Sequence, residues 1–266
     1  MSNIRPPAVA GSFYPADARI LSSDVRTLLD SAQEADLIPK ALIAPHAGYI
    51  YSGSVAASAY ASLRPVAARI RRVILLGPTH RIPVRGLAMP DADTFVTPLG
   101  EIALDTEAMQ TISSLPQVSV SGAAHAFEHA LEVQLPFLQM ALQDFTLLPL
   151  AVGDASGEEV SEVLQRLWGG EETLIVISSD LSHYLPYDLS RLVDSKTAQN
   201  ILKLRPTITH EEACGATPIN GLLLSARAHH LTAHLLDLRN SGDTAGPRDG
   251  VVGYAAFAFC EESSHE

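Results

Sequence analysis

The chain has 266 residues and is acidic, with 30 aspartates and glutamates against 18 lysines and arginines, so its formal net charge is −12. This charge argues against a general nucleic-acid-binding surface and against an anionic-membrane surface. Hydrophobic residues make up 47% of the chain, and its two cysteines are too few for a disulfide framework. No signal peptide is recognisable, and no apolar run approaches the ~20 residues that cross a bilayer. We therefore expect a soluble cytoplasmic protein.

Continuous apolar runs alternate with helical patterns along the chain. The predicted elements are, in chain order, strand 41–45, helix 52–63, strand 72–77, helices 105–114 and 128–142, strand 145–153, helix 157–169, strand 173–179, helices 194–204 and 215–229, and strands 232–242 and 250–260. Such alternation predicts a mainly parallel central sheet flanked by helices, with the last two strands as an antiparallel pair. No linker divides the chain, so we expect one α/β domain over residues 1–266.

Polar residues follow three of these predicted strands. His46 comes after "ALIAP", His80 after "RVILLGPT", and Asp180 after "TLIVISS", with His183 three residues further on. In open α/β sheets, ligands bind outside the carboxyl ends of the strands. A single histidine at such a position is more often a core or capping residue. Repeated placement at equivalent positions favours a shared site.

Cys214, in "EEACGATPINGLL", precedes a predicted helix. One interpretation is a small buried hydrophobe, the usual role of a free cysteine. The other is a thiolate ligand or nucleophile, because a helix N-terminus lowers the pKa of a thiol. The residues alone leave both interpretations open, whereas Cys260, at the end of an apolar strand, is predicted to lie in the core.

The segment "HAFEHALEVQLPF" places four polar residues on one face if it is helical throughout. They are His125, Glu128, His129 and Glu132. This face is either a solvated stripe or a buried one that needs partners or a metal. No HExxH, GxGxxG, GxxxxGK[ST] or GxSxG pattern occurs, so a nucleotide cofactor is unsupported.

Six segments, taken together and in order, resemble the Memo family. They are "RPPAVAGSFYP", "APHAGYIYSG", "LGPTHR", "FEHALEVQLPFLQ", "SSDLSHY" and "ACGATPINGLL". Microbial members of this family are identified as protein B of the AmmeMemoRadiSam system. The resemblance covers residue 5 to about residue 259, and it implies the fold of class III extradiol ring-cleavage dioxygenases. Those enzymes hold iron(II) with two histidines and a glutamate.

The resemblance also implies roles for individual residues. His46, His80 and Cys214 match the family's metal ligands, with the cysteine in place of the dioxygenase carboxylate. His183 matches the dioxygenase acid/base histidine, and Asp180 matches a pocket residue that orients it or binds substrate. His129 matches a further pocket-facing position and completes the candidate catalytic set.

A thiolate in place of a carboxylate softens the ligand set, which favours iron(II), copper or zinc over magnesium, and iron(II) is the metal we expect first. Three functions remain open. The first is a metal-dependent redox enzyme with a dioxygenase-like pocket; the second is a non-catalytic protein that binds a metal or a peptide; the third is a metal-dependent hydrolase. The ligand is an unknown small molecule or peptide, and the resemblance implies functional association with radical-SAM and AMMECR-type proteins.

Overall fold

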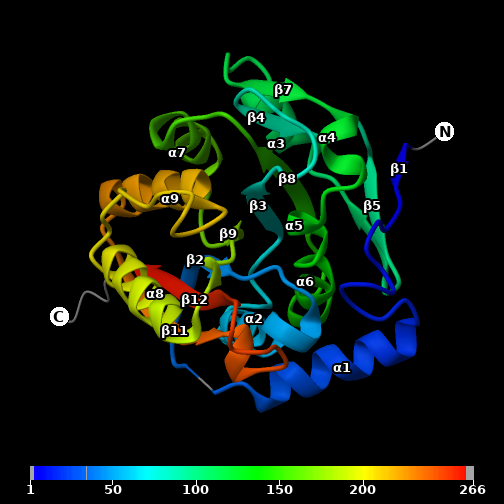
Figure 1. Cartoon of the computed structure of the whole chain (residues 1–266). Coiled ribbons are helices and arrows are strands. Elements are labelled where there is room, and N and C mark those ends of the chain that lie inside the picture. The colour runs from blue at the N-terminus through cyan, green and yellow to red at the C-terminus, as the bar shows by residue number, and fades with distance from the viewer. Residues whose placement is uncertain (1–2, 34, 262–266) are drawn as a thin grey trace.

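A large mixed sheet forms the centre of the molecule (Figure 1). The computed structural model describes residues 3–33 and 35–261. The sheet has the order β10-β12-β2-β9-β3-β8-β4-β7, and β11 also pairs with β12. Its strands are β2 (Pro39–Ala44), β3 (Arg72–Pro78), β4 (Leu87–Met89), β7 (Val118–Val120), β8 (Thr146–Val152), β9 (Thr173–Ser178), β10 (His183–Leu185), β11 (Leu231–Asn240) and β12 (Val251–Glu261).

The four central strands are parallel, as the sequence predicts. β2, β9, β3 and β8 pair in parallel registers, and nearly every residue in them is buried. The outer strands differ, because β4 is antiparallel to β8, while β12 is antiparallel to β2, β10 and β11. The predicted antiparallel pairing of the last two strands is confirmed, and so is the α/β class with a central sheet between helices.

Helices cover both faces of the sheet (Figure 1). Alternate residues of β2 point to opposite layers, with Leu42 in one hydrophobic cluster and Ile43 in the other, because side chains alternate along a strand. One layer contains α1 (Ala18–Ser31), α2 (Tyr49–Ala61), α5 (His129–Glu132) and α6 (Leu135–Ala141); the other contains α3 (Thr106–Ile112), α7 (Gly157–Leu167), α8 (Tyr187–Leu202) and α9 (Ala216–Ala228).

The single helix predicted over residues 128–142 is wrong. The segment holds two short helices, α5 and α6, after a separate α4 (Gly122–Ala126). Pro136 lies in the first turn of α6. Proline has no N–H to donate and its ring clashes with the carbonyl four residues earlier, so it favours a helix start over a helix interior.

Two other differences have local physical reasons. Helix α8 begins at Tyr187 and not near Asp194, because its buried face is partly polar and gives no hydrophobic period; Asp194 there accepts hydrogen bonds from Ser190 Oγ and the Ser182 N–H. The stretch 89–101, for which the sequence predicts no strand, contains most of a hairpin of β5 (Thr94–Thr97) and β6 (Gly100–Ala103), with a positive φ at Gly100. This hairpin and β1 (Ile4–Arg5) form a separate three-stranded sheet.

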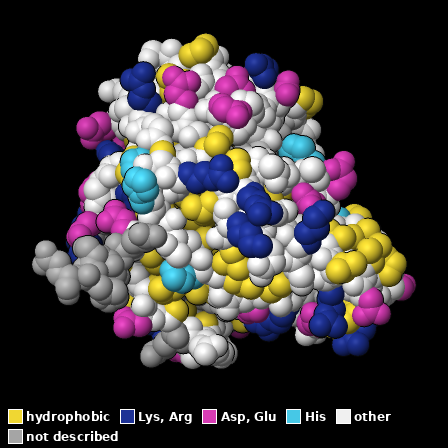
Figure 2. All heavy atoms as spheres, turned by 90° about the vertical axis from the view of Figure 1, so that its left-hand side faces the viewer, with side chains coloured by type: hydrophobic (Ala, Val, Ile, Leu, Met, Phe, Trp, Pro, Cys, Tyr) yellow, Lys and Arg dark blue, Asp and Glu magenta, His cyan; other side chains and the backbone are white. Residues whose placement is uncertain are grey.

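The surface carries charges of both signs. On the face shown in Figure 2, lysine and arginine side chains gather near the middle, with acidic and hydrophobic side chains around them. Helix α8 exposes Leu189 and Leu192. Within residues 3–33 and 35–261, no helix combines the length and apolar character that crossing a bilayer requires.

Candidate metal centre

Three adjacent parallel strands end at the same edge of the sheet, and each is followed two residues later by a polar side chain. His46 follows β2, Asp180 follows β9 and His80 follows β3. Ala44 pairs with Ser178 at the ends of β2 and β9, so His46 and Asp180 leave the sheet side by side. The His46 N–H donates to Asp180 Oδ1 at 2.7 Å. The predicted grouping at the carboxyl edge of the sheet is therefore what the fold produces.

His129, at the start of α5, joins His46 and His80. The ring centroids lie 5.3 Å apart for His46 and His80, 5.5 Å for His46 and His129, and 4.7 Å for His80 and His129. One ring nitrogen of each histidine lies within 4.8 Å of the other two, so the three can hold a metal ion. His46 is buried, with 2% of the residue exposed, whereas the side chains of His129 and His80 are 17% and 29% exposed. The cluster is therefore open to solvent on one side.

The protonation of the His46 ring follows from its surroundings. Its Nδ1 lies 2.9 Å from Ser178 Oγ, and that hydroxyl donates its only proton to the Ala130 carbonyl at 2.6 Å. Ser178 Oγ also accepts from Gln134 Nε2. The hydroxyl can therefore only accept from His46, which places the ring proton on Nδ1 and leaves the Nε2 lone pair free to bind a metal.

His80 and His129 share one carboxylate. Glu128 accepts from the His80 N–H at 2.6 Å, and its Oε1 lies 2.9 Å from His80 Nδ1 and 3.3 Å from His129 Nδ1. Glu128 is 2% exposed, and its Oε1 also accepts from the Ala130 N–H. Burial raises its pKa, but the hydrogen bonds from the His80 ring, the Ala130 N–H and the His80 N–H outweigh that effect and lower the pKa to about 2.

Cys214 stands next to this cluster, just before the N-cap Gly215 of α9. Its Sγ lies 3.4 Å from His46 Nε2 and 3.8 Å from Ser179 Oγ. Burial, followed by the nearby Asp180 charge, raises the pKa of the Cys214 thiol to about 12. The lowered pKa that one interpretation of the sequence invoked is therefore absent without a metal, and only a bound cation would favour the thiolate.

The family resemblance implies that Asp180 either orients His183 or binds substrate. Within the part of the chain that the structure describes, Asp180 accepts from the His46 backbone, and no hydrogen bond joins it to the His183 ring. His183 begins β10, opposite Val252 of β12. A positive charge on its ring lowers the pKa of both Asp180 and His46. Burial raises the pKa of Asp180, which the His46 N–H partly offsets.

Two rings of the cluster are neutral at physiological pH. Burial lowers the pKa of His46 to about 3, with a further contribution from the neighbouring His80. Burial lowers the pKa of His129 to about 4, with a contribution from His46. Neutral imidazole is the form that binds metals, so these two rings carry available lone pairs.

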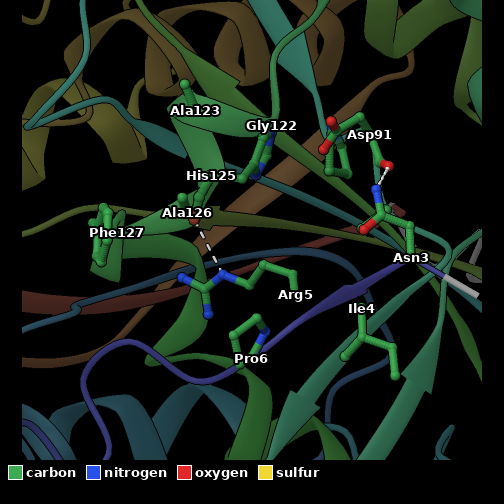
Figure 3. Close-up of a pocket in the computed structure, with 12 residues that line it drawn as sticks. Asn3, Ile4, Arg5, Pro6, Asp91, Gly122, Ala123, His125, Ala126 and Phe127 are labelled. Carbon is green, nitrogen blue, oxygen red and sulfur yellow. Dashed lines mark hydrogen bonds between the residues drawn. The ribbon is translucent and has the colours of Figure 1, made fainter.

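The polar face predicted over residues 125–132 is not a solvated stripe, and its members separate. Glu132 is fully buried in an ion pair with Arg5, and His125 donates through Nε2 to the Ala88 carbonyl. His125 and Arg5 line a cavity of about 340 Å³ between the N-terminal segment and α4 (Figure 3). None of the three clustered histidines lines this cavity, so it is separate from the candidate metal centre.

Sequence reasoning missed Ser178, and it named Glu128 on the polar face without assigning it to the histidine rings. Ser178 is the last residue of β9, and Glu128 is next to His129 in "FEHA". A polar residue at the end of an otherwise apolar strand was the available signal for Ser178. For Glu128, the signal was its place beside a candidate histidine, but its contact with His80 requires β3 and α5 to be neighbours in space.

We expect Ser178→Ala to weaken metal binding by about 10-fold, because partners of ligating histidines set ring orientation and tautomer. The measurement is a zinc titration of metal-free protein by calorimetry. Ser62→Ala is the matched control, because Ser62 is also fully buried and its hydroxyl donates to the Ala59 carbonyl in α2, away from the histidines. Equal losses in the two variants would contradict the role of Ser178.

The sheet and its edge define a class of α/β protein with a histidine-rich candidate metal centre at the carboxyl ends of parallel strands. Residues 5–258 match the family described as Memo-like protein. The chain is 35% identical to a MEMO1 family protein of Aquifex aeolicus and 37% identical to one of Archaeoglobus fulgidus, each over 96% of this chain and 99% of the relative. The chain therefore belongs to the Memo family.

A solved structure shares the fold at low sequence identity. An uncharacterized protein of Escherichia coli K12 matches 82% of this chain and 98% of its own, with a TM-score of 0.53 and 15% identity. At this identity the likeness concerns the fold alone.

Proposed function

We propose that the protein binds one transition-metal ion through His46, His80 and Cys214 and uses it in redox chemistry on an unidentified small molecule. The observation that carries the proposal is the 3.4 Å separation of His46 Nε2 and Cys214 Sγ. Typical metal–nitrogen and metal–sulfur bonds of about 2.1 and 2.3 Å place two tetrahedral ligands about 3.6 Å apart. The two atoms thus lie at the spacing that a shared metal requires.

The donor set fits a borderline or soft cation. Two imidazoles and a thiolate suit iron(II), copper or zinc, and iron(II) is our first choice for a dioxygenase-like pocket. Such a metal supplies Lewis acidity and, for iron or copper, electron transfer. Asp180 balances part of the positive charge while it holds the His46 backbone. The exposure of His80 leaves one side of the cluster open to a substrate.

The remaining residues have roles that do not need direct ligation. His183, half-buried on β10 and electrostatically coupled to Asp180, is our candidate for proton transfer to or from the substrate. His129 is neutral and faces the same position as His46 and His80, so it is a pocket group and a candidate fourth donor.

Anaerobic metal loading followed by exposure to dioxygen tests the proposal. Untagged protein is analysed for its metal content, depleted of metal and reloaded with iron(II), copper(I) or zinc in turn. Stoichiometric binding of one ion, with dioxygen uptake by the iron or copper form above that of the free ion, supports a redox enzyme. Failure of every metal to bind at one per chain overturns the proposal.

We expect His183→Ala to retain the metal while dioxygen uptake falls by about 10²–10⁴-fold, the usual contribution of an acid/base group. His46→Ala is the comparison variant, because it removes a proposed ligand. Metal loss in His183→Ala as large as in His46→Ala would instead make His183 a ligand.

The alternative function is a non-catalytic protein that holds a metal or a peptide at this edge of the sheet. Stoichiometric metal binding without dioxygen uptake would favour it. The partners we propose, radical-SAM and AMMECR-type proteins, follow from the family resemblance.

A further inference from the structure

One buried carboxylate contacts two histidines that come from different parts of the fold. Glu128 Oε1 lies 2.9 Å from His80 Nδ1 and 3.3 Å from His129 Nδ1, while Oε2 accepts from the His80 N–H at 2.6 Å. His80 follows β3, and His129 begins α5. The same side chain therefore connects the end of a central strand to the helix packed beside it.

The chemistry of a carboxylate limits the state of both rings. An ionised carboxylate accepts hydrogen bonds and donates none. Contact between such a carboxylate and a ring nitrogen is favourable only when that nitrogen carries a proton. In the neutral state each ring therefore favours a proton on Nδ1 and a free lone pair on Nε2, the state that Ser178 imposes on His46.

We propose that Glu128 is a positioning residue that fixes the tautomer and orientation of His80 and His129 together, so that both Nε2 atoms face the metal position. The consequence for metal affinity rests on the proposed function, but the tautomers are a property of the protein without metal. Shared control by one carboxylate means that a single substitution disturbs two rings.

The chain holds Glu128 rigidly enough for this role. Its side chain caps α5 by accepting from the Ala130 N–H, and its own carbonyl accepts from Arg5 Nη2 at 2.8 Å. Arg5 is itself buried, and it forms an ion pair with Glu132, which follows Glu128 by four residues. The carboxylate is thus fixed through its backbone as well as through its hydrogen bonds.

The test is nitrogen-15 NMR of the histidine rings in metal-free protein, in mildly alkaline buffer, for the wild type and for Glu128→Gln. The wild type is expected to show protonated Nδ1 and bare Nε2 at both His80 and His129. In Glu128→Gln the neutral amide either turns its NH₂ toward the rings or offers them a weaker acceptor than a carboxylate, so the share of the Nε2-protonated tautomer is expected to rise in at least one ring. Zinc affinity is then expected to fall by about 10–100-fold.

Asp105→Asn is the matched control. Asp105 is also a buried carboxylate at a helix N-cap, accepting from the Ala108 N–H of α3, but it pairs with Arg72 and lies outside the group formed by His46, His80 and His129. It is expected to leave both tautomers and zinc affinity unchanged, because a general loss of a helix cap does not move a ring proton.

Protons on Nε2 in the wild type, or unchanged tautomers in Glu128→Gln, would overturn the inference, and the wild-type measurement does not depend on the variant folding. If the wild type shows the expected tautomers but binds no metal, the proposed function fails and the positioning role of Glu128 stands. If metal binds but Glu128→Gln binds it equally well, the role of Glu128 in affinity is refuted and the metal proposal survives.

Discussion

Cys214→Ser is expected to abolish tight metal binding while the protein remains folded. The serine hydroxyl is a far poorer ligand than a thiolate for iron(II), copper or zinc. The loss should exceed the ~10–100-fold that removal of a ligand's hydrogen-bond partner costs, because a ligand itself is removed. Anaerobic titration of the metal-free proteins with each of the three metals measures the effect, and circular dichroism checks the fold.

The second free cysteine provides the control. Cys260 is buried on β12 and pairs in register with Pro39 at the start of β2, at the opposite end of that strand from His46. Cys260→Ser should leave the affinity for all three metals unchanged. If Cys214→Ser also binds every metal as the wild type does, Cys214 is a packing residue, and the ligand set must be sought among the three histidines.

Glu132→Ala is expected to lower the free energy of unfolding by about 3–5 kcal/mol, the usual cost of removing one partner of a buried ion pair. The Glu132 side chain is fully buried and pairs with Arg5, which is 6% exposed. It also accepts hydrogen bonds from the N–H groups of Ala8 and Val9 and from the Tyr14 hydroxyl. The substitution leaves a buried guanidinium and three donors without this acceptor. Urea denaturation measures the change.

An exposed ion pair is the matched control for this prediction. Arg69 Nη1 and Glu171 Oε2 lie 2.9 Å apart, but the two side chains are 44% and 79% exposed. Because water and salt screen such pairs, Glu171→Ala should change the free energy of unfolding by less than about 1 kcal/mol. We call Glu132 and its partners Arg5, Ala8, Val9 and Tyr14 the Glu132 network. Equal effects of the two substitutions would mean that this network does not hold the N-terminal segment in place.

The Glu132 network also contacts the segment that carries the candidate metal centre. Arg5 donates to the carbonyls of His125 and Glu128, so it fixes the segment that leads into α5. The N-terminal segment thus supports the part of the chain that carries Glu128 and His129. Substitutions in the N-terminal segment are expected to change stability first, and the candidate metal centre only through the backbone.

Several features of this protein were determined by the sequence itself. The central strands are apolar along their whole length, and such runs are stable only when both faces are covered, so the α/β class could be predicted. His46, His80 and Asp180 each follow such a strand at a short, fixed distance. Parallel strands place those positions at one edge, so their grouping could also be predicted.

Other features were decided only by the tertiary structure. The segment around Glu128 and His129 looked like one helix because periodicity cannot reveal where a proline begins a new helix and turns neighbouring side chains to different surroundings. His129 reaches the cluster, whereas His125 turns to the Ala88 carbonyl and Glu132 to Arg5. The contact of Glu128 with His80 spans 48 residues of chain. Such a contact has no local signal, because it exists only once β3 and α5 have packed together.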